Sequence, residues 1–286
     1  MPAAWGKIAS VAVATLLCLA SPCQARRESG QGRVVVAYVT SWSQGFPDPT
    51  VMTHINYAFG KVTASHDGLS VDNPQRLRDI VALKRQNPSL KVLLSVGGWG
   101  AGGFSEMASQ ESTRRRFCAA CDSVASLYGL DWEYPGSDAA GIASSPADRD
   151  HFTVLMRDLR KVLGSGRLLT LATAAMGGFY DFPAFVDEVD FVCMMTYDMA
   201  SAPGHHAPLH SSARFQGSSC EQAMQAHLAQ GVPADKLVLG LPFYGRGTQD
   251  VGNFCDFHAV AGLRDYTSHW DRHARVPYLT DREGRV

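Results

Sequence analysis

Short apolar runs alternate with longer helix-like stretches along most of this chain. The runs, rich in β-branched residues, predict seven strands, over residues 33–40, 54–59, 91–96, 127–131, 168–174, 191–197 and 236–244. Apolar residues at helical spacing predict helices over residues 73–86, 111–127, 148–163 and 219–230. Strands that alternate with helices in this way indicate a parallel sheet of βα units with helices on its faces.

The pattern of elements fits either an open doubly wound sheet or a closed barrel. Residues that can carry chemistry collect at or just after the ends of the predicted strands. They are Tyr38, Phe59, Gly97 to Trp99, Asp131, Glu133, Met195 to Asp198 and Tyr244. Because a (β/α)8 barrel builds its active site at the carboxyl ends of its strands, this distribution favours the barrel.

The first 25 residues differ from the rest. Lys7 precedes an apolar run over residues 8–20, and small residues lead up to Ala25. This order is typical of a secretory signal peptide, and the run is shorter than the roughly 20 residues of a membrane-spanning helix. We therefore predict a signal peptide over residues 1–25 and a secreted protein, extracellular or periplasmic, with no membrane attachment after cleavage. An uncleaved membrane anchor is the alternative.

Charge and cysteine content narrow the possible functions. A net charge of -1, without blocks of like charge, disfavours nucleic-acid binding. Five cysteines follow the signal segment, and pairing among Cys193, Cys220 and Cys255 is possible in an oxidising compartment. Cys118 and Cys121 fall inside a predicted helix rather than at its start, which argues against a redox pair.

Two carboxylates stand two residues apart at the end of the fourth predicted strand. On a strand, Asp131 and Glu133 share one face. Two adjacent negative charges raise one of the two pKa values, so that one carboxyl group stays protonated near neutrality. Such a protonated carboxyl group is the acid that cleavage of a glycosidic bond needs.

Five motifs strengthen this interpretation. They are I-N-Y-A-F (55–59), S-V-G-G-W (95–99), L-D-W-E-Y-P-G (130–136), M-T-Y-D (195–198) and G-L-P-F-Y-G-R (240–246). Together and in this order the motifs resemble those of the chitinases of glycoside hydrolase family 18, over residues 33 to about 280. The resemblance implies an α/β fold, the (β/α)8 TIM barrel, that cleaves β-1,4-linked N-acetylglucosamine polymers. Its implied partner is chitin or chito-oligosaccharide.

The resemblance also implies roles for individual residues. Glu133 is the expected general acid, Asp131 the carboxylate that holds the substrate's acetamido group, and Tyr197 its positioning partner. The remaining expected substrate contacts are Tyr38, Phe59, Trp99, Met195, Asp198, Tyr244 and Arg246. The implied mechanism is substrate-assisted with retention, and it needs neither metal nor cofactor. His205, His206 and His210 have no carboxylate or cysteine at ligand spacing, so we expect no metal site there.

The chain departs from the family pattern in two places. The family strand carries D-x-x-D-x-D-x-E, and here Ser126 and Gly129 occupy the first two acidic positions. This departure predicts a shortened fourth strand. The second departure lies at the C-terminus, where an eighth strand is expected to be missing. We expect residues 26–286 to form a catalytic barrel that is incomplete at its C-terminus, with residues 248–286 as part of an insertion after the seventh strand.

Three functions remain open from the sequence. The first is hydrolysis of chitin or chito-oligosaccharides, and the second is carbohydrate binding without turnover, as in lectin-like relatives. The third is an endo-N-acetylglucosaminidase that acts on glycoprotein glycans. The presence of Glu133 favours an enzyme, and the set of motifs favours the chitinase branch. The oligomeric state has no signal in the sequence.

Overall fold

The computed structural model describes residues 33–125, 129–133, 141–213, 217–248, 251–252 and 254–286, with residues 125 and 129–133 described by their backbone alone. Residues Val34–Val286 form one compact unit. The predicted signal peptide over residues 1–25 lies outside the described residues. Within the described part, no helix has both the length and the apolar character needed to cross a bilayer.

Eight strands make up the main sheet. They are β1 (Val36–Thr40), β2 (His54–Val62), β3 (Leu69–Val71), β4 (Lys91–Val96), β5 (Gly129–Glu133), β6 (Leu169–Ala174), β7 (Phe191–Met195) and β8 (Leu237–Leu239). The helices around the sheet are α1 (Pro74–Ala82), α2 (Phe104–Ser109), α3 (Glu111–Ala125), α4 (Asp148–Leu163), α5 (Phe182–Phe185) and α6 (Cys220–Ala229). Further elements follow, namely β9 (Tyr244–Gly245), β10 (Cys255–Asp256), α7 (Phe257–Ala261), β11 (Thr267–Asp271) and β12 (Val276–Thr280).

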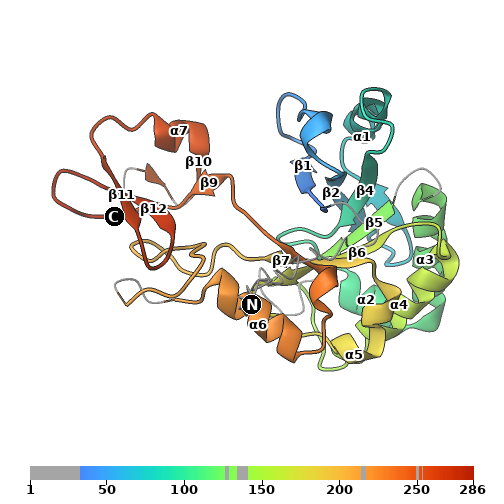
Figure 1. Ribbon diagram of the computed structural model, residues 1–286. Coiled ribbons are helices and arrows are strands. Elements are labelled where there is room, and N and C mark those ends of the chain that lie inside the picture. Colours follow the sequence, from blue (N-terminus) through green and yellow to red (C-terminus); the bar gives the residue numbers. More distant parts are fainter. Residues whose placement is uncertain (1–32, 126–128, 134–140, 214–216, 249–250, 253) are drawn as a thin grey trace, which may run out of the picture. The chain divides into compact units, whose positions relative to one another are not determined.

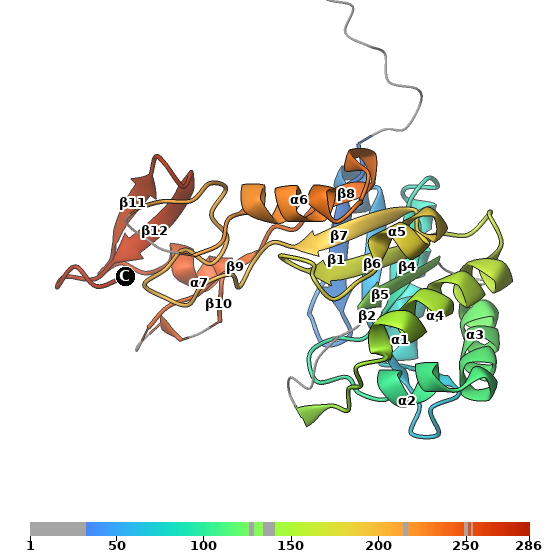
Figure 2. The ribbon, with the colours of Figure 1, turned by 90° about the horizontal axis from the view of Figure 1, so that it is seen from below.

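The parallel strands lie side by side in the sheet in the same order as in the sequence. Its order is β1-β2-β4-β5-β6-β7-β8, and each neighbouring pair is parallel, while β3 pairs antiparallel with β2. Helices α2, α3 and α4 lie together on one side of this sheet (Figure 1). The order is that of a (β/α)8 barrel, and the described residues contain seven of its parallel strands. After β8 the chain forms two small antiparallel pairs, with α7 packed on β9 and β10 (Figure 2).

The two faces of the strands have different surroundings. Ile55, Leu94 and Leu171, which share one face, are fully buried in the hydrophobic core. The core also contains Phe117 of α3 and Phe152 of α4, so this is the helix-covered face. Burial of such side chains contributes about 1.5–3 kcal/mol each. The period-two pattern of the strands therefore fixes one face against the helices.

The opposite face carries buried polar residues near its centre. Asn56 of β2, Ser95 of β4 and Thr170 of β6 are fully buried there. The pairing register sets Ser95 opposite Asp131 and Asp131 opposite Thr170. Position 131 thus lies between two buried hydroxyl residues in the middle of the sheet.

The fourth parallel strand corrects one expectation from the sequence. β5 has five residues, as many as β1 and β7, and pairs with both of its neighbours. Helix α3 ends at Ala125, two residues earlier than the sequence pattern predicts, and this leaves three residues before the strand. The strand keeps a length of five residues because it begins at Gly129 and continues to Glu133, two residues beyond its predicted end.

The seventh parallel strand is shorter than predicted. A single strand was expected over residues 236–244, but β8 ends at Leu239 and Tyr244 pairs with Asp256 in β9 and β10. Gly240 passes so close to the Met194 carbonyl that a side chain there would collide with it. Pro242 cannot donate to a ladder. The apolar composition suggested one strand, and these two residues end it early.

The described cysteines form no disulfide bond with one another, so the possible pairing among Cys193, Cys220 and Cys255 does not occur here. Cys118 and Cys121 are buried on α3. Burial raises the pKa of Cys118 to about 12 and also raises that of Cys121. Because the thiolate is the reactive form, these two residues behave as core side chains.

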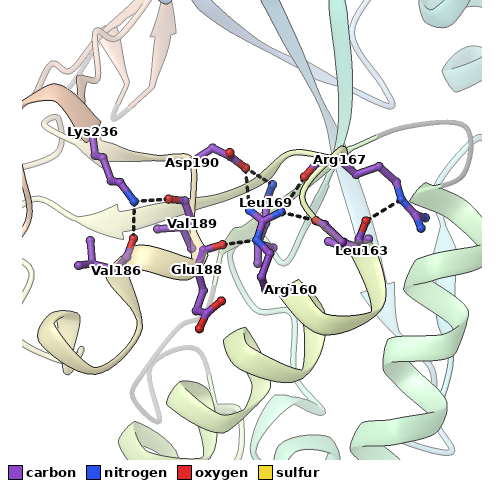
Figure 3. A network of polar contacts seen from close by, with 10 residues as sticks. Arg160, Leu163, Arg167, Leu169, Val186, Glu188, Val189, Asp190 and Lys236 are labelled. Atoms are coloured by element: carbon purple, nitrogen blue, oxygen red, sulfur yellow. Dashed lines mark hydrogen bonds and ion pairs between the residues drawn. The ribbon is translucent and has the colours of Figure 1, made fainter.

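A cationic network holds the amino ends of β6 and β7 (Figure 3). The Arg160 guanidinium donates to the carbonyls of Gly164, Arg167 and Glu188 at 2.7–2.8 Å, and to Asp190 at 2.8 Å. The same Asp190 oxygen accepts from the backbone N–H of Leu169 at 2.8 Å. Arg160 therefore joins the end of α4 to both strands.

Arg160→Ala should destabilise the fold by about 2–3 kcal/mol, since it leaves several carbonyls and a carboxylate without their donor. The matched control is Arg157→Ala on the same helix, which removes one hydrogen bond to the Ala184 carbonyl. We expect the control to cost less than about 1 kcal/mol. Urea unfolding measures both variants, and equal losses would show that the network contributes no more than a single exposed contact.

A buried histidine joins α6 to β6. His227 Nδ1 lies 2.9 Å from the Ala223 carbonyl, which can only accept, so this nitrogen carries the proton. Nε2 then accepts from the Thr173 hydroxyl at 2.8 Å. The ring is neutral in this arrangement, and burial lowers its pKa.

This histidine should make stability depend on pH. A folded-state pKa below the unfolded value near 6.5 gives a contribution that is complete above about pH 6.5 and is lost as the pH falls toward the folded pKa. We expect the stability advantage of the wild type over His227→Gln to shrink between about pH 7 and pH 5. Thermal unfolding across this range measures the difference, and a constant advantage would contradict the assignment.

Candidate active site

The two catalytic candidates lie on the central strand of the sheet. β5 is the fourth of seven parallel strands, and it ends at Glu133. The register sets Asp131 between Ser95 and Thr170, and Glu133 opposite Ala172 of β6. The side chains of Asp131 and Glu133 lie outside the described part of the structure. The backbone thus places both residues at the carboxyl end of the middle strand.

A second group of predicted residues meets beyond β7. The Asp198 carboxylate lies 2.9 Å from the Arg246 guanidinium and is hydrogen bonded by the Tyr244 hydroxyl. The Tyr244 ring lies 6.3 Å from the Tyr197 ring in an edge-on arrangement. Residues from the M-T-Y-D and G-L-P-F-Y-G-R motifs, far apart in the sequence, therefore form one cluster.

Burial and nearby charge determine the packing of Arg246 and the protonation of Tyr244 in this cluster. Arg246 is well buried at 13% exposure and stacks on Phe254, while Asp198 is 35% exposed. Burial and the nearby Asp198 carboxylate raise the pKa of Tyr244, so that its hydroxyl stays protonated and can donate. The cluster presents to solvent a carboxylate that is held by an arginine and by a tyrosine hydroxyl.

The backbone at Gly240 packs closely against the segment that carries Tyr197 and Asp198. The Thr196 hydroxyl donates to the Gly240 carbonyl at 2.7 Å, and Gly240 lies directly against the Tyr197 ring. Met195, at the end of β7, is partly exposed, whereas its neighbour Met194 is buried on the opposite face. Met195 is therefore the methionine on the side of Tyr197, as the alternation of the strand predicts.

A third group consists of aromatic residues on β1 and β2 and after β4. The Phe59 ring packs directly on Gly98, whose φ of +97° and lack of a side chain permit this contact. Trp99 follows and is 88% exposed. Tyr38 of β1 is also exposed, at 40%, and is paired in register with Asn56. Trp99 and Tyr38 therefore expose ring surface to solvent, while Phe59 packs against the loop that carries Trp99.

Two residues of the site were missed in the sequence. Trp42 lies 6.3 Å from the Phe59 ring, is 66% exposed and lines a surface pocket of about 480 Å³. The sequence contained a signal for Trp42, since this residue follows a predicted strand by two residues, and Trp99 follows another by three. His206 lies 3.5 Å from Asp198, and no local pattern indicated this contact.

The histidines between β7 and α6 contact separate carboxylates. His205 pairs with Asp271 at 3.2 Å and His210 with Glu221 at 2.9 Å, each with a different carboxylate. Across the described residues, no three histidine, cysteine or acidic side chains are grouped so as to hold a metal ion.

Comparison with known proteins identifies the family. Residues 34–286 match Glycosyl hydrolases family 18. Chitotriosidase-1 of Mus musculus is 35% identical over 256 residues, which cover 76% of this chain and 54% of the mouse protein. The chain spans about half the length of the curated relatives it matches, with 50–54% covered in each case.

Solved structures agree with the family match. A family 18 N-acetylglucosaminidase from Paenibacillus barengoltzii has a TM-score of 0.77 at 32% identity, with 89% of this chain and 86% of that one covered. A group IV chitinase of Ostrinia furnacalis in complex with allosamidin has a TM-score of 0.74 at 27% identity, with 87% and 83% covered. The fold is that of these enzymes, the (β/α)8 barrel, and the chain belongs to glycosyl hydrolases family 18.

Proposed function

We propose that this protein hydrolyses β-1,4-linked N-acetylglucosamine polymers, chitin and chito-oligosaccharides. The observation that carries the proposal is the position of Asp131 and Glu133 at the carboxyl end of the central strand. Membership of family 18, together with relatives named as chitinases, supports the same substrate class.

Glu133 is the general acid of the proposed reaction. It donates a proton to the glycosidic oxygen, which lets the C–O bond break and the leaving sugar depart as an alcohol. General acid catalysis of this kind contributes about 10²–10⁴-fold to the rate. After the leaving sugar departs, the Glu133 carboxylate is the base that takes a proton from water.

The substrate's acetamido group is the nucleophile. Its carbonyl oxygen attacks the anomeric carbon from the opposite face and forms an oxazolinium ion, whose positive charge the Asp131 carboxylate stabilises. Water then opens the ring with overall retention. Tyr197 and Asp198 hold the acetamido group for this attack. The contacts of Asp198 with Arg246 and Tyr244 support this role because they hold its carboxylate in place.

Exposed rings hold the sugar chain. Trp99 and Trp42 offer flat apolar faces of the kind on which pyranose rings stack, and Phe59 lies between their loops against Gly98. Tyr38, Met195, Tyr244 and Arg246 are the remaining proposed contacts. The chemistry uses side chains and substrate alone.

One observation favours a second candidate, a carbohydrate-binding protein with little turnover. Asn56 is fully buried, and within the described part of the chain neither polar atom of its amide has a hydrogen-bond partner. Gly129, in the same register row across Leu93, provides no side chain where the family pattern has an acid. An unsatisfied amide beside this position is what a weakened catalytic centre would contain.

Glu133→Gln separates the two candidates. The amide keeps the shape of the side chain but cannot donate a proton to the leaving oxygen, so release of product from chitohexaose should fall by about 10²–10⁴-fold while binding persists. Glu111→Gln on α3 is the control, because this exposed glutamate faces solvent away from β5. Turnover by the wild type that survives in Glu133→Gln would place the acid elsewhere. Binding without turnover in the wild type would support the second candidate.

We also propose that residues 1–25 are a signal peptide and that residues 26–286 form the exported catalytic region. The composition of the first 25 residues supports this assignment. Amino-terminal sequencing of protein collected outside the cell should begin at Arg26. Extracellular protein that begins at Met1 would contradict the cleavage site.

A further inference from the structure

The loop between β7 and α6, residues 199–213, carries three histidines that face three different carboxylates. His205 Nε2 lies 3.2 Å from Asp271 of β11, and both side chains are buried. His210 Nδ1 lies 2.9 Å from Glu221 of α6, on a more exposed surface. These two contacts tie the loop on either side of His206.

The third histidine faces the candidate site. His206 Nδ1 lies 3.5 Å from Asp198 Oδ1, and its ring lies 5.3 Å from the Tyr244 ring. Nδ1 is buried, and among the described residues no hydrogen-bond partner comes closer to it. A buried histidine nitrogen that lies 3.5 Å from a carboxylate oxygen can donate to that oxygen when it carries a proton.

Asp198 also has an unusual backbone conformation. Its backbone has a φ of +57°, the left-handed region that residues other than glycine rarely adopt. Arg246 Nη1 contacts the same oxygen, Oδ1, at 2.9 Å. His206 Nδ1 and Arg246 Nη1 both contact Oδ1 of Asp198. These two contacts therefore set the rotation of the carboxylate, and neither of them involves Oδ2.

We propose that His206 is a positioning residue that orients the Asp198 carboxylate toward the acetamido group of the substrate. The inference rests on the proposed function and adds a residue to its machinery. The imidazole acts through Asp198 and does not touch the reacting atoms.

Protonation strengthens this contact. Burial lowers the pKa of His206, and the Asp198 carboxylate opposes the shift. The other charged or titratable groups that face the ring are Tyr244 and Arg246, from β9 and the residue after it. A protonated ring can donate to Asp198 and to the Tyr244 backbone carbonyl together, whereas a neutral ring can donate only once.

Three variants test the role. His206→Ala removes the contact, His206→Asn keeps a donor near the position of Nδ1 without titrating, and His210→Asn is the matched control on the same loop. With chitotetraose as substrate, kcat/KM should fall about tenfold in His206→Ala, as expected for loss of a hydrogen bond to a charged group. His206→Asn should recover most of the loss at neutral pH, and His210→Asn should match the wild type.

The pH profile provides a readout that a purely structural role would not move. The ratio of wild-type to His206→Asn kcat/KM should rise as the pH is lowered from about 7.5 to about 5.5, because only the wild type gains the second donor. Comparison with His206→Asn cancels ionisations that both proteins share. An unchanged kcat/KM in His206→Ala would overturn the inference, as would a loss in His206→Asn as large as in His206→Ala.

If the proposed function were wrong, the same experiment would give a different result from a failure of the positioning role alone. Wild-type protein that neither cleaves nor binds chitotetraose would remove the proposed function, and the role of His206 would fall with it. Active wild-type protein with an unaffected His206→Ala variant would overturn the positioning role alone.

Discussion

The pairing register of the parallel strands is the constraint on which the rest of the structure depends. Successive residues of a strand point to opposite faces, so a shift by one residue would exchange the faces of a whole strand. In this register Ile55, Leu94 and Leu171 enter the helix-covered core. The same register brings Ser95, Asp131 and Thr170 into one row across the centre of the sheet. Core packing thereby determines where the catalytic candidates stand.

The other half of the site depends on contacts between loops. Asp198 follows β7 in a left-handed conformation and is held by Arg246, Tyr244 and His206, which come from two later segments of the chain. Gly240 makes this meeting possible, because its path against the Tyr197 ring leaves no room for a side chain. The sheet thus carries the two acidic residues of β5, and the segments after β7 and β8 carry the cluster around Asp198.

Much of this organisation could be predicted from the sequence. Residues 91–96 and 148–163 coincide with β4 and α4, because apolar period and length agree there. The end of β8 could not be predicted, since the steric limit at Gly240 comes from a carbonyl 46 residues earlier in the chain. The contact of His206 with Asp198 likewise needs the fold of an irregular loop. The motifs indicated which residues belong to the candidate site. The contacts that join Tyr197, Asp198, Tyr244 and Arg246 in one cluster depend on tertiary packing.

The central claim is that the carboxylates of β5 act with the substrate's own acetamido group. The most direct measurement compares hydrolysis of chitotetraose with that of its fully de-N-acetylated counterpart at equal concentration, with the anomeric form of the first product followed by proton NMR. The account predicts cleavage of the acetylated substrate alone, with the β-anomer appearing first. Comparable cleavage of the de-N-acetylated chain, or initial release of the α-anomer, would contradict it.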